Sequence, residues 1–465
     1  KGYDKGDFTF VFGYPGTTRE YLTSTGVDVI ANHENPLRIS LRQMRLDIMK
    51  AAMEESRQVR IQYTAKSNGI ANFWKKMIGE SRGIRRANAI DIKRSEEEQF
   101  LAWCKGDATR ITKYGDVIRT LQTTYEKNLP VNLAYIYMTE AAMGIEAVRF
   151  AAGFRELVKL SGDKKRNPEE WSKVVSSVRR NAADFYKNWN AGIDEKVMSV
   201  MLARMYTGMD KGFRPEVIDQ IADKNGGNFQ SYSRTVFVTS IFTDSSRMLR
   251  LLAEIKPSRA ASLKKDPVYK LMDGIYADWE TKILPGLQRF TGRIDSLQRV
   301  YMAGQMEMYK EGSLYPDANG TLRVAFGKVD DYRPADAVQY FHFTTLDGVM
   351  QKEDTTVYDY HVDPRLKQLH EQKDYGPYAD KDGRLHIAFT ASNHTTGGNS
   401  GSPVLNAEGH LIGINFDRNW EGTLSDLHYD PEQCRNIALD IRYCLFVMDK
   451  LYGNSHLVRE MTIVN

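Results

Sequence analysis

The sequence predicts an α+β protein in which a long helical region interrupts a β domain. Apolar, β-type runs lie at 8–12 and again from 322 onward. Between about 34 and 312, apolar residues recur every three or four positions, which is helical spacing. We therefore expect the end of an N-terminal β part at 1–33, an inserted helical domain at 34–312 and a C-terminal β domain at 313–465.

Composition indicates a soluble globular protein with an ample core. Of the 465 residues, 42% are hydrophobic and 27% are charged, and the net charge of +4 is too small to indicate nucleic acid or membrane binding. No apolar run reaches the ~18 residues of a membrane span. Cys104, Cys434 and Cys444 have neither a disulfide-framework nor a metal-site spacing, so we expect buried thiols and neither metal nor cofactor.

The first residues lack an initiator methionine and a signal-peptide pattern. They lead directly into the predicted strand 8–12, a Pro15-Gly16 turn and an extended stretch around 28–30. A domain rarely begins in this way, so we expect the chain to start part-way through a β domain.

Helix starts are marked by asparagine and proline. Asn35-Pro36 predicts a helix with Asn35 as N-cap, and Asn167-Pro168 predicts another. Pro215 is expected to begin a third. The Met and Tyr residues of this region fit helix packing and show no cofactor motif.

The C-terminal part returns to β-type sequence. Asn319-Gly320 predicts a two-residue hairpin whose second strand is 322–326, and Asp382-Gly383 precedes a strand at 385–389. Residues 358–372 are expected to form a loop with a short helix. The apolar run 440–452 predicts a final helix.

A glycine-rich turn around Ser400 carries the chemistry. Gly398 stands two residues before Ser400, so both backbone N–H groups can converge on one point, as an oxyanion hole requires. Residues 404–418 then predict a hairpin with its turn at 406–409. The alternative is an ordinary glycine-rich surface turn, because short motifs give false positives.

The end of the returning strand contains side chains that could determine which substrates bind. Arg418 offers a planar fork of donors that matches a carboxylate, and Asp417 suits an ammonium group. Phe416 precedes them on the same wall. The alternative is that Asp417 and Arg418 are exposed turn residues that pair weakly with each other.

A nucleophilic serine needs a general base and an orienting acid. The chain has nine histidines, but His33 opens the helical region and His394 lies only six residues before Ser400. None has the expected strand-end context followed by an acid. We therefore expect the base and its acid to lie outside this chain.

The run from His394 through Gly422 resembles the bacterial dipeptidyl-peptidase 7 and 11 family of chymotrypsin-like serine peptidases. The resemblance covers the whole chain as the C-terminal two-thirds of such a protein. It implies a chymotrypsin-like double β-barrel, its first barrel largely missing here, with a large inserted helical cap domain. It also implies that Ser400 is the nucleophile and that Gly398 and Ser400 are the oxyanion donors.

The same resemblance suggests roles in substrate binding. Arg418 stands where the acidic-specific members, the dipeptidyl-peptidase 11 branch, carry arginine and the hydrophobic-specific members carry glycine. This implies release of N-terminal dipeptides with Asp or Glu in the second (P1) position. Asp417 and Asn72 resemble the residues that bind the free N-terminal amine. Asn399 stands where trypsin-type enzymes carry the Asp that pairs with a newly freed N-terminus.

The resemblance further implies oligopeptide substrates with a free N-terminus, a homodimer, and a place in the bacterial periplasm or at the cell surface. With the base outside the chain, we expect these 465 residues alone to be inactive. Two alternatives stay open: an endopeptidase on the same fold, and a helical peptide-binding module with a vestigial protease domain.

Overall fold

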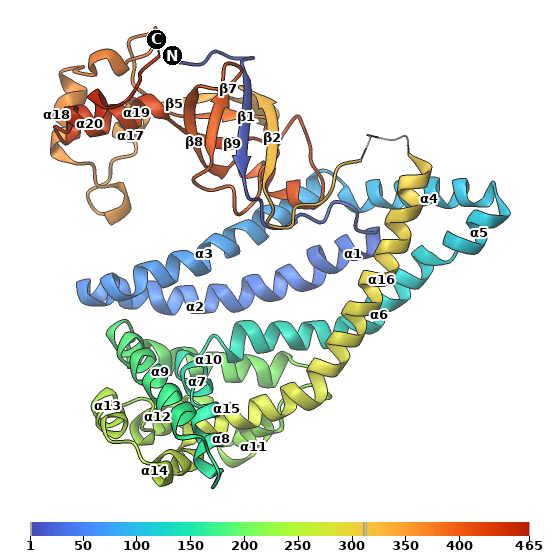
Figure 1. The fold of residues 1–465 in the computed structure, drawn as a ribbon, viewed down its shortest axis with the longest axis vertical. Coiled ribbons are helices and arrows are strands. Elements are labelled where there is room, and N and C mark those ends of the chain that lie inside the picture. The colour runs from blue at the N-terminus through green and yellow to red at the C-terminus, as the bar shows by residue number, and fades with distance from the viewer. Residues whose placement is uncertain (1, 310–311, 313, 465) are drawn as a thin grey trace. The chain divides into compact units, whose positions relative to one another are not determined.

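The computed structural model describes residues 2–309, 312 and 314–464, and the chain forms two compact units (Figure 1). The β unit comprises Lys1–Leu22, Gly79–Lys93 and Tyr309–Asn465, and the helical unit comprises Thr23–Ile78 and Arg94–Met308. We predicted boundaries after residues 33 and 312. The units instead divide after 22 and 308, and the segment 79–93 belongs with the β unit.

The β unit is built on a seven-stranded antiparallel sheet in the order β2-β1-β7-β8-β9-β6-β5. Its strands are β1 (Phe8–Gly13), β2 (Arg323–Lys328), β5 (Phe343–Thr345), β6 (His386–Ala391), β7 (Pro403–Asn406), β8 (Leu411–Arg418) and β9 (Asn436–Asp440). A two-stranded sheet pairs β3 (Tyr332–Ala335) with β4 (Val338–Tyr340). The described residues form no closed barrel.

The hairpin after Ser400 is confirmed: β7 pairs with β8, and Gly409 has φ +81° in the turn between them. The hairpin predicted at Asn319-Gly320 is wrong. The following strand, β2, pairs with β1 in the register Phe10↔Phe326. The local turn signal was present, since Gly320 has φ +79°, but the partner strand comes from the start of the chain.

The stretch around 28–30 is helical, not extended. Helix α1 (Ser24–Asp28) begins at Thr23, whose side chain accepts the Gly26 N–H, and continues through a π-helical turn (Val29–Glu34) into α2 (Asn35–Glu55). Asn35 therefore has helical angles (φ −60°, ψ −45°) and is not the N-cap that we predicted. Burial of this segment overrides the β preference of its branched side chains. Asn167, by contrast, is confirmed as an N-cap, since it accepts the Glu169 N–H at 2.8 Å.

The region from 34 to 308 is almost entirely helical, as predicted (Figure 1). The helices after α2 are α3 (Arg57–Arg86), α4 (Ala89–Lys105), α5 (Ala108–Tyr114), α6 (Val117–Ile136), α7 (Glu146–Ala152), α8 (Arg155–Gly162), α9 (Pro168–Lys187), α10 (Ala191–Gly208), α11 (Glu216–Lys224), α12 (Phe229–Thr239), α13 (Ser245–Ala253), α14 (Pro257–Ser262), α15 (Pro267–Asp278) and α16 (Leu284–Met308). A large apolar core joins most of them. Among the described residues, no helix is both long and apolar enough to cross a bilayer.

Four short helices complete the β unit: α17 (Leu346–Gln351), α18 (Pro364–Glu371), α19 (Ile441–Phe446) and α20 (Ser455–Arg459). The helix predicted at 440–452 is confirmed. It consists of α19 followed directly by a π-helical turn (Val447–Leu451). All three cysteines are free thiols; Cys104 and Cys434 are buried and Cys444 is half-buried.

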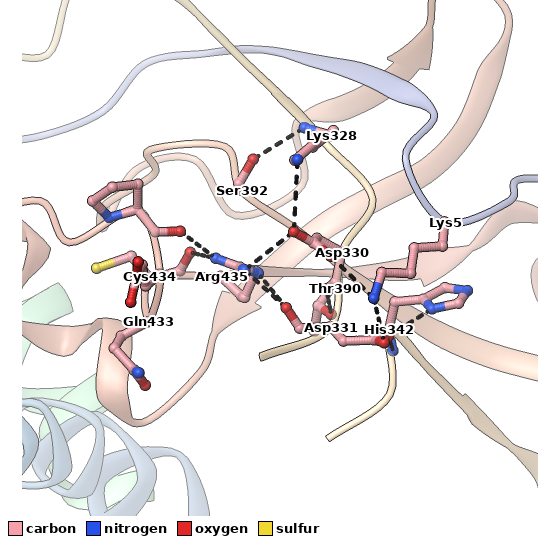
Figure 2. Close-up of polar contacts among 12 residues, drawn as sticks. Lys5, Lys328, Asp330, Asp331, His342, Thr390, Ser392, Gln433, Cys434 and Arg435 are labelled. Carbon is pink, nitrogen blue, oxygen red and sulfur yellow. Dashed lines mark hydrogen bonds and ion pairs between the residues drawn. The ribbon is translucent and has the colours of Figure 1, made fainter. Parts of the chain in front are cut away.

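A polar cluster around Arg435 fixes the start of β9 (Figure 2). The Arg435 guanidinium donates to the Asp331 carbonyl from Nε (3.2 Å) and Nη2 (2.8 Å). The Asp331 carboxylate accepts from Lys5 (2.7 Å) and His342 (2.8 Å). Although burial acts to raise the pKa of Asp331, these donors lower it to about 2. The Arg435 carbonyl also accepts the Asn419 N–H, and the Arg435 N–H donates to Asn419 Oδ1, so the cluster anchors the segment that follows β8.

Candidate active site

Ser400 lies in an exposed turn whose backbone leaves two donors available. The N–H groups of Asn399, Gly401 and Ser402 donate to the carbonyls of Thr396, Asn415 and Asn399, respectively. Among the described residues, the N–H groups of Gly398 and Ser400 have no acceptor. An oxyanion hole needs two such donors. One belongs to the predicted nucleophile Ser400 itself and the other to Gly398, two residues earlier.

Three buried asparagines hold this turn. The Asn436 amide donates to Asn415 Oδ1 (3.0 Å), and the Asn415 amide donates to the Asn399 carbonyl (3.1 Å). Asn399 Oδ1 accepts the Thr396 N–H (3.0 Å). Each of the three asparagines is at most 2% exposed. Since buried polar groups are costly unless paired, these linked asparagine hydrogen bonds favour one conformation of the Ser400 turn.

The segment after β1 packs directly against the turn. Gly398 has φ +108°, and a Cβ there would overlap the Tyr14 carbonyl. The Gly16 N–H donates to the Gly397 carbonyl at 2.7 Å. A Cβ on Gly13 would collide with Asn399 and Ser402 side chains. Glycine is therefore required on both sides of this contact.

Arg418, at the end of β8, is buried and tightly paired. Its Nη1 and Nη2 donate end-on to the Asp426 carboxylate at 2.7 and 3.1 Å. Nη1 also reaches Ser425 Oγ (2.7 Å) and the Thr395 carbonyl (3.2 Å). The side chain is 12% exposed. The alternative of an exposed turn residue pairing with Asp417 is therefore wrong for Arg418, since its partner is Asp426.

One edge of the Arg418 guanidinium remains open. Nε donates to no acceptor among the described residues, and Nη2 uses one hydrogen on Asp426. Burial acts to lower the pKa of Arg418, but the negative charges of Asp426 and Glu80 outweigh it, so the net pKa is raised and the charge is secure. A carboxylate could therefore dock side-on at Nε and Nη2 while Asp426 holds the other edge.

His394 is occupied by contacts other than Ser400. Its Nε2 lies 2.8 Å from the Ser425 carbonyl, and its ring stacks on Tyr429 at 4.7 Å. Burial lowers the pKa of His394. The Ser400 hydroxyl itself makes one hydrogen bond within the described residues, a long one to the Phe416 carbonyl (3.4 Å). No histidine in the described chain is therefore hydrogen-bonded to Ser400.

A buried carboxyl group lies beside His394. Glu20 Oε1 is 3.7 Å from His394 Nδ1 and has no hydrogen-bond partner within the described part of the chain, while Glu20 Oε2 accepts from Tyr315 (2.7 Å). Burial raises the pKa of Glu20 to about 7, although the Tyr315 hydrogen bond opposes this. Glu20 can thus change charge near neutral pH.

The remaining predicted residues lie as follows. Asp417 is exposed on β8, and its carboxylate accepts only the Arg418 N–H (2.8 Å) among the described residues, so it can receive an ammonium group. Phe416 is 47% exposed beside it. Asn72 lies on α3 in the helical unit, next to Phe73, which is 59% exposed.

Asp426 and Glu20 were missed from sequence. Asp426 ends a 3-10 helical segment (Glu421–Asp426) with no periodic pattern, and Glu20 lies in an irregular stretch. A buried arginine needs an acidic partner. The prediction that Arg418 lies in a binding pocket could therefore have prompted a search for an acid near it in the sequence, such as Asp426.

In a possible metal-binding group of Asp380, Asp382 and His386, the two carboxylates already pair with arginines. Arg442 pairs with Asp380 at 2.6 Å, and Arg384 pairs with Asp382 at 2.7 Å. Both carboxylates are therefore already paired with guanidinium groups.

Known proteins are similar to this chain over its whole length. A model of the Peptidase S46 family matches residues 1–463. The chain is 36% identical to an Asp/Glu-specific dipeptidyl-peptidase of Flavobacterium psychrophilum and 35% identical to a dipeptidyl-peptidase 7 of Phocaeicola vulgatus. Each alignment covers 100% of this chain and 64% of the relative.

A solved structure is similar over the same span. The crystal structure of Porphyromonas endodontalis DPP11 in complex with the dipeptide Arg-Glu has 32% sequence identity and a TM-score of 0.89, over 99% of this chain and 65% of that chain. The present chain therefore spans slightly less than two thirds of these proteins. On the strength of the family match over nearly its whole length, the chain belongs to the Peptidase S46 family.

Proposed function

We propose that this chain provides the nucleophile, the oxyanion donors and the P1 specificity wall of a serine dipeptidyl-peptidase selective for Asp or Glu at P1. The observation that carries the proposal is the open Nε–Nη2 edge of buried Arg418, on the strand that follows the Ser400 turn. Ser400 would attack the carbonyl, and the N–H groups of Gly398 and Ser400 would stabilise the oxyanion. Asp417 would bind the substrate amine, a role that is also predicted for Asn72.

The general base and its acid are proposed to come from outside these 465 residues. The absence of a histidine bonded to Ser400 in the described chain supports this, as does the greater length of the relatives. We also infer that the seven-stranded sheet is part of a chymotrypsin-like double barrel, since β7 and β8 form the nucleophile hairpin. A homodimer and a periplasmic or cell-surface location stay predictions.

The proposal is tested on the full-length protein with fluorogenic peptides that differ at P1 and in N-terminal acetylation. We expect turnover of free-amine substrates with Asp or Glu at P1, and a loss of about 10⁴- to 10⁶-fold in kcat for Ser400→Ala. Cleavage of acetylated peptides would instead indicate an endopeptidase. Failure of a fluorophosphonate to label Ser400 would indicate a peptide-binding module. The 465-residue chain alone is expected to give no turnover.

A further inference from the structure

The helical unit contains a basic cavity that the proposed reaction does not use. Its volume is about 430 Å³, within the ~300–1,000 Å³ of small-molecule sites. Four arginines and a single carboxylate share its walls with apolar side chains. The lining residues are Arg38, Arg42, Arg45, Gly69, Ile70, Phe73, Tyr135, Thr139, Glu140, Met143 and Arg149.

Glu140 neutralises only part of this charge. Its Oε1 accepts from Arg42 (2.7 Å) and Arg38 (3.3 Å), whereas its Oε2 lies 3.9 Å from Arg45, too far for a hydrogen bond. Arg149 donates to the Met143 carbonyl at 3.3 Å and lies 3.8 Å from the Glu146 carboxylate, which also pairs with Lys66 at 2.6 Å. The cavity therefore retains a surplus of positive charge.

Among the four arginines of this cavity, Arg45 is the one whose guanidinium group has no hydrogen bond within the described residues. It is 8% exposed and makes no hydrogen bond within the described residues, and its Nε is fully buried without a partner. The Nε of Arg42 is also buried and unpaired. Although burial lowers the pKa of Arg45, a guanidinium is not deprotonated in proteins. A buried charge without an acceptor is costly, so the site is built for an anionic partner.

We propose that this cavity binds an oxyanion group, a carboxylate or a phosphoryl group, on a small organic molecule or peptide. Planar guanidinium forks match both groups. The side chains of Ile70, Phe73 and Tyr135 would contact the apolar part of the ligand. Arg42 already lies over the Phe73 ring, 5.4 Å from its centroid, so the anionic and apolar surfaces adjoin.

The test compares inorganic phosphate and N-acetyl-glutamate with chloride at equal ionic strength, by calorimetric titration and thermal shift on the purified protein. We expect saturable binding of at least one oxyanion. Arg45→Met should weaken it at least tenfold. The matched control Arg119→Met, at a 78% exposed arginine of the same unit, should leave it unchanged. Phosphate binding alone would identify a phosphoryl ligand, and acetyl-glutamate binding alone a carboxylate ligand.

Two further variants keep the result decisive. Arg149→Met changes the more exposed wall of the cavity, where the side chain is 55% exposed, and should weaken binding several-fold even if Arg45→Met does not fold. Arg418→Gly should leave this binding intact, which separates the cavity from the proposed P1 site. Equal response to chloride, or undiminished binding in the Arg45 and Arg149 variants, would overturn the proposal.

Discussion

Arg418 and Arg45 are buried to the same degree but are satisfied differently. Their side chains are 12% and 10% exposed, respectively. Arg418 donates to three groups and has a bidentate counter-ion in Asp426. Arg45 has no hydrogen bond within the described residues and a carboxylate oxygen only at 3.9 Å. Burial alone therefore does not show how completely an arginine is paired within the fold; the acceptors around it do.

The two sites also differ in what they require of a ligand. Arg418 is already neutralised, so an acidic P1 side chain would add a second carboxylate at the open edge and gain mainly from geometry. Arg45 has no hydrogen bond within the described residues, so an anion there would supply a missing acceptor. The following experiments test this difference, beginning with the largest expected effect.

Replacing Arg418 with glycine should have the largest effect. In the full-length protein, Arg418→Gly should lower kcat/KM for substrates with Asp or Glu at P1 by about 100- to 1,000-fold, because a buried charged hydrogen-bond partner is removed. Labelling of Ser400 by a fluorophosphonate should persist, since the turn is held by asparagines. An unchanged preference for acidic substrates would show that Arg418 does not bind P1.

Asp426→Asn should reduce stability. Removing one partner of a buried pair costs about 3–5 kcal/mol, so the free energy of unfolding measured with urea should fall by that order. A double variant, Arg418→Met with Asp426→Leu, should recover most of the loss because neither charge remains. If the single and double variants are equally unstable, the pair is not the cause.

Glu20 is a buried carboxyl group that can become neutral by taking up a proton. A guanidinium group has no such route, because it stays protonated in proteins. Since the folded pKa of Glu20 is raised from 4.5 to about 7, its contribution to stability is fully present below pH 4.5 and is lost as pH rises through 7. The loss relative to Glu20→Gln should reach about 2–3 kcal/mol between pH 5 and 8.

The difference between wild type and Glu20→Gln isolates this group from its titratable neighbour His394, whose pKa shifts the other way. Urea unfolding midpoints at several pH values provide the measurement. A difference that stays constant across the range would place the Glu20 pKa outside it.

Arg45→Met should have the smallest effect and the opposite sign. In chloride buffer without oxyanions, removing an unpaired buried charge should leave stability unchanged or raise it by about 1 kcal/mol. Thermal unfolding beside the Arg119→Met control is a sufficient measurement. A loss as large as that of Asp426→Asn would mean that Arg45 is satisfied within the fold.

The sequence predicted those parts of the molecule that depend on local signals. The Ser400 turn, the hairpin after it and most helices follow from glycine placement and periodicity within short windows. The partner of β2 could not be found this way, because β1 lies about 300 residues earlier. Long-range pairing is decided by packing, which short windows do not contain.

The same distinction applies to the two charged sites. Asp426 lies in an irregular segment, and only the folded chain brings it to Arg418. The basic cavity does have one local pattern in the sequence, the spacing of three arginines. Arg38, Arg42 and Arg45 are spaced i, i+4 and i+7 on α2, which places them on one helix face. Their enclosure by other helices still required the structure.

The three asparagines under Ser400 have a consequence for how the proposed site would respond to pH. By the resemblance given above, Asn399 stands where trypsin-type enzymes carry an aspartate, and its Oδ1 accepts the Thr396 N–H. An amide has no charge to gain or lose, so none of the three asparagines that hold the turn titrates. In the proposed reaction, pH dependence would therefore come from the charged groups near the turn and not from the amides that hold it.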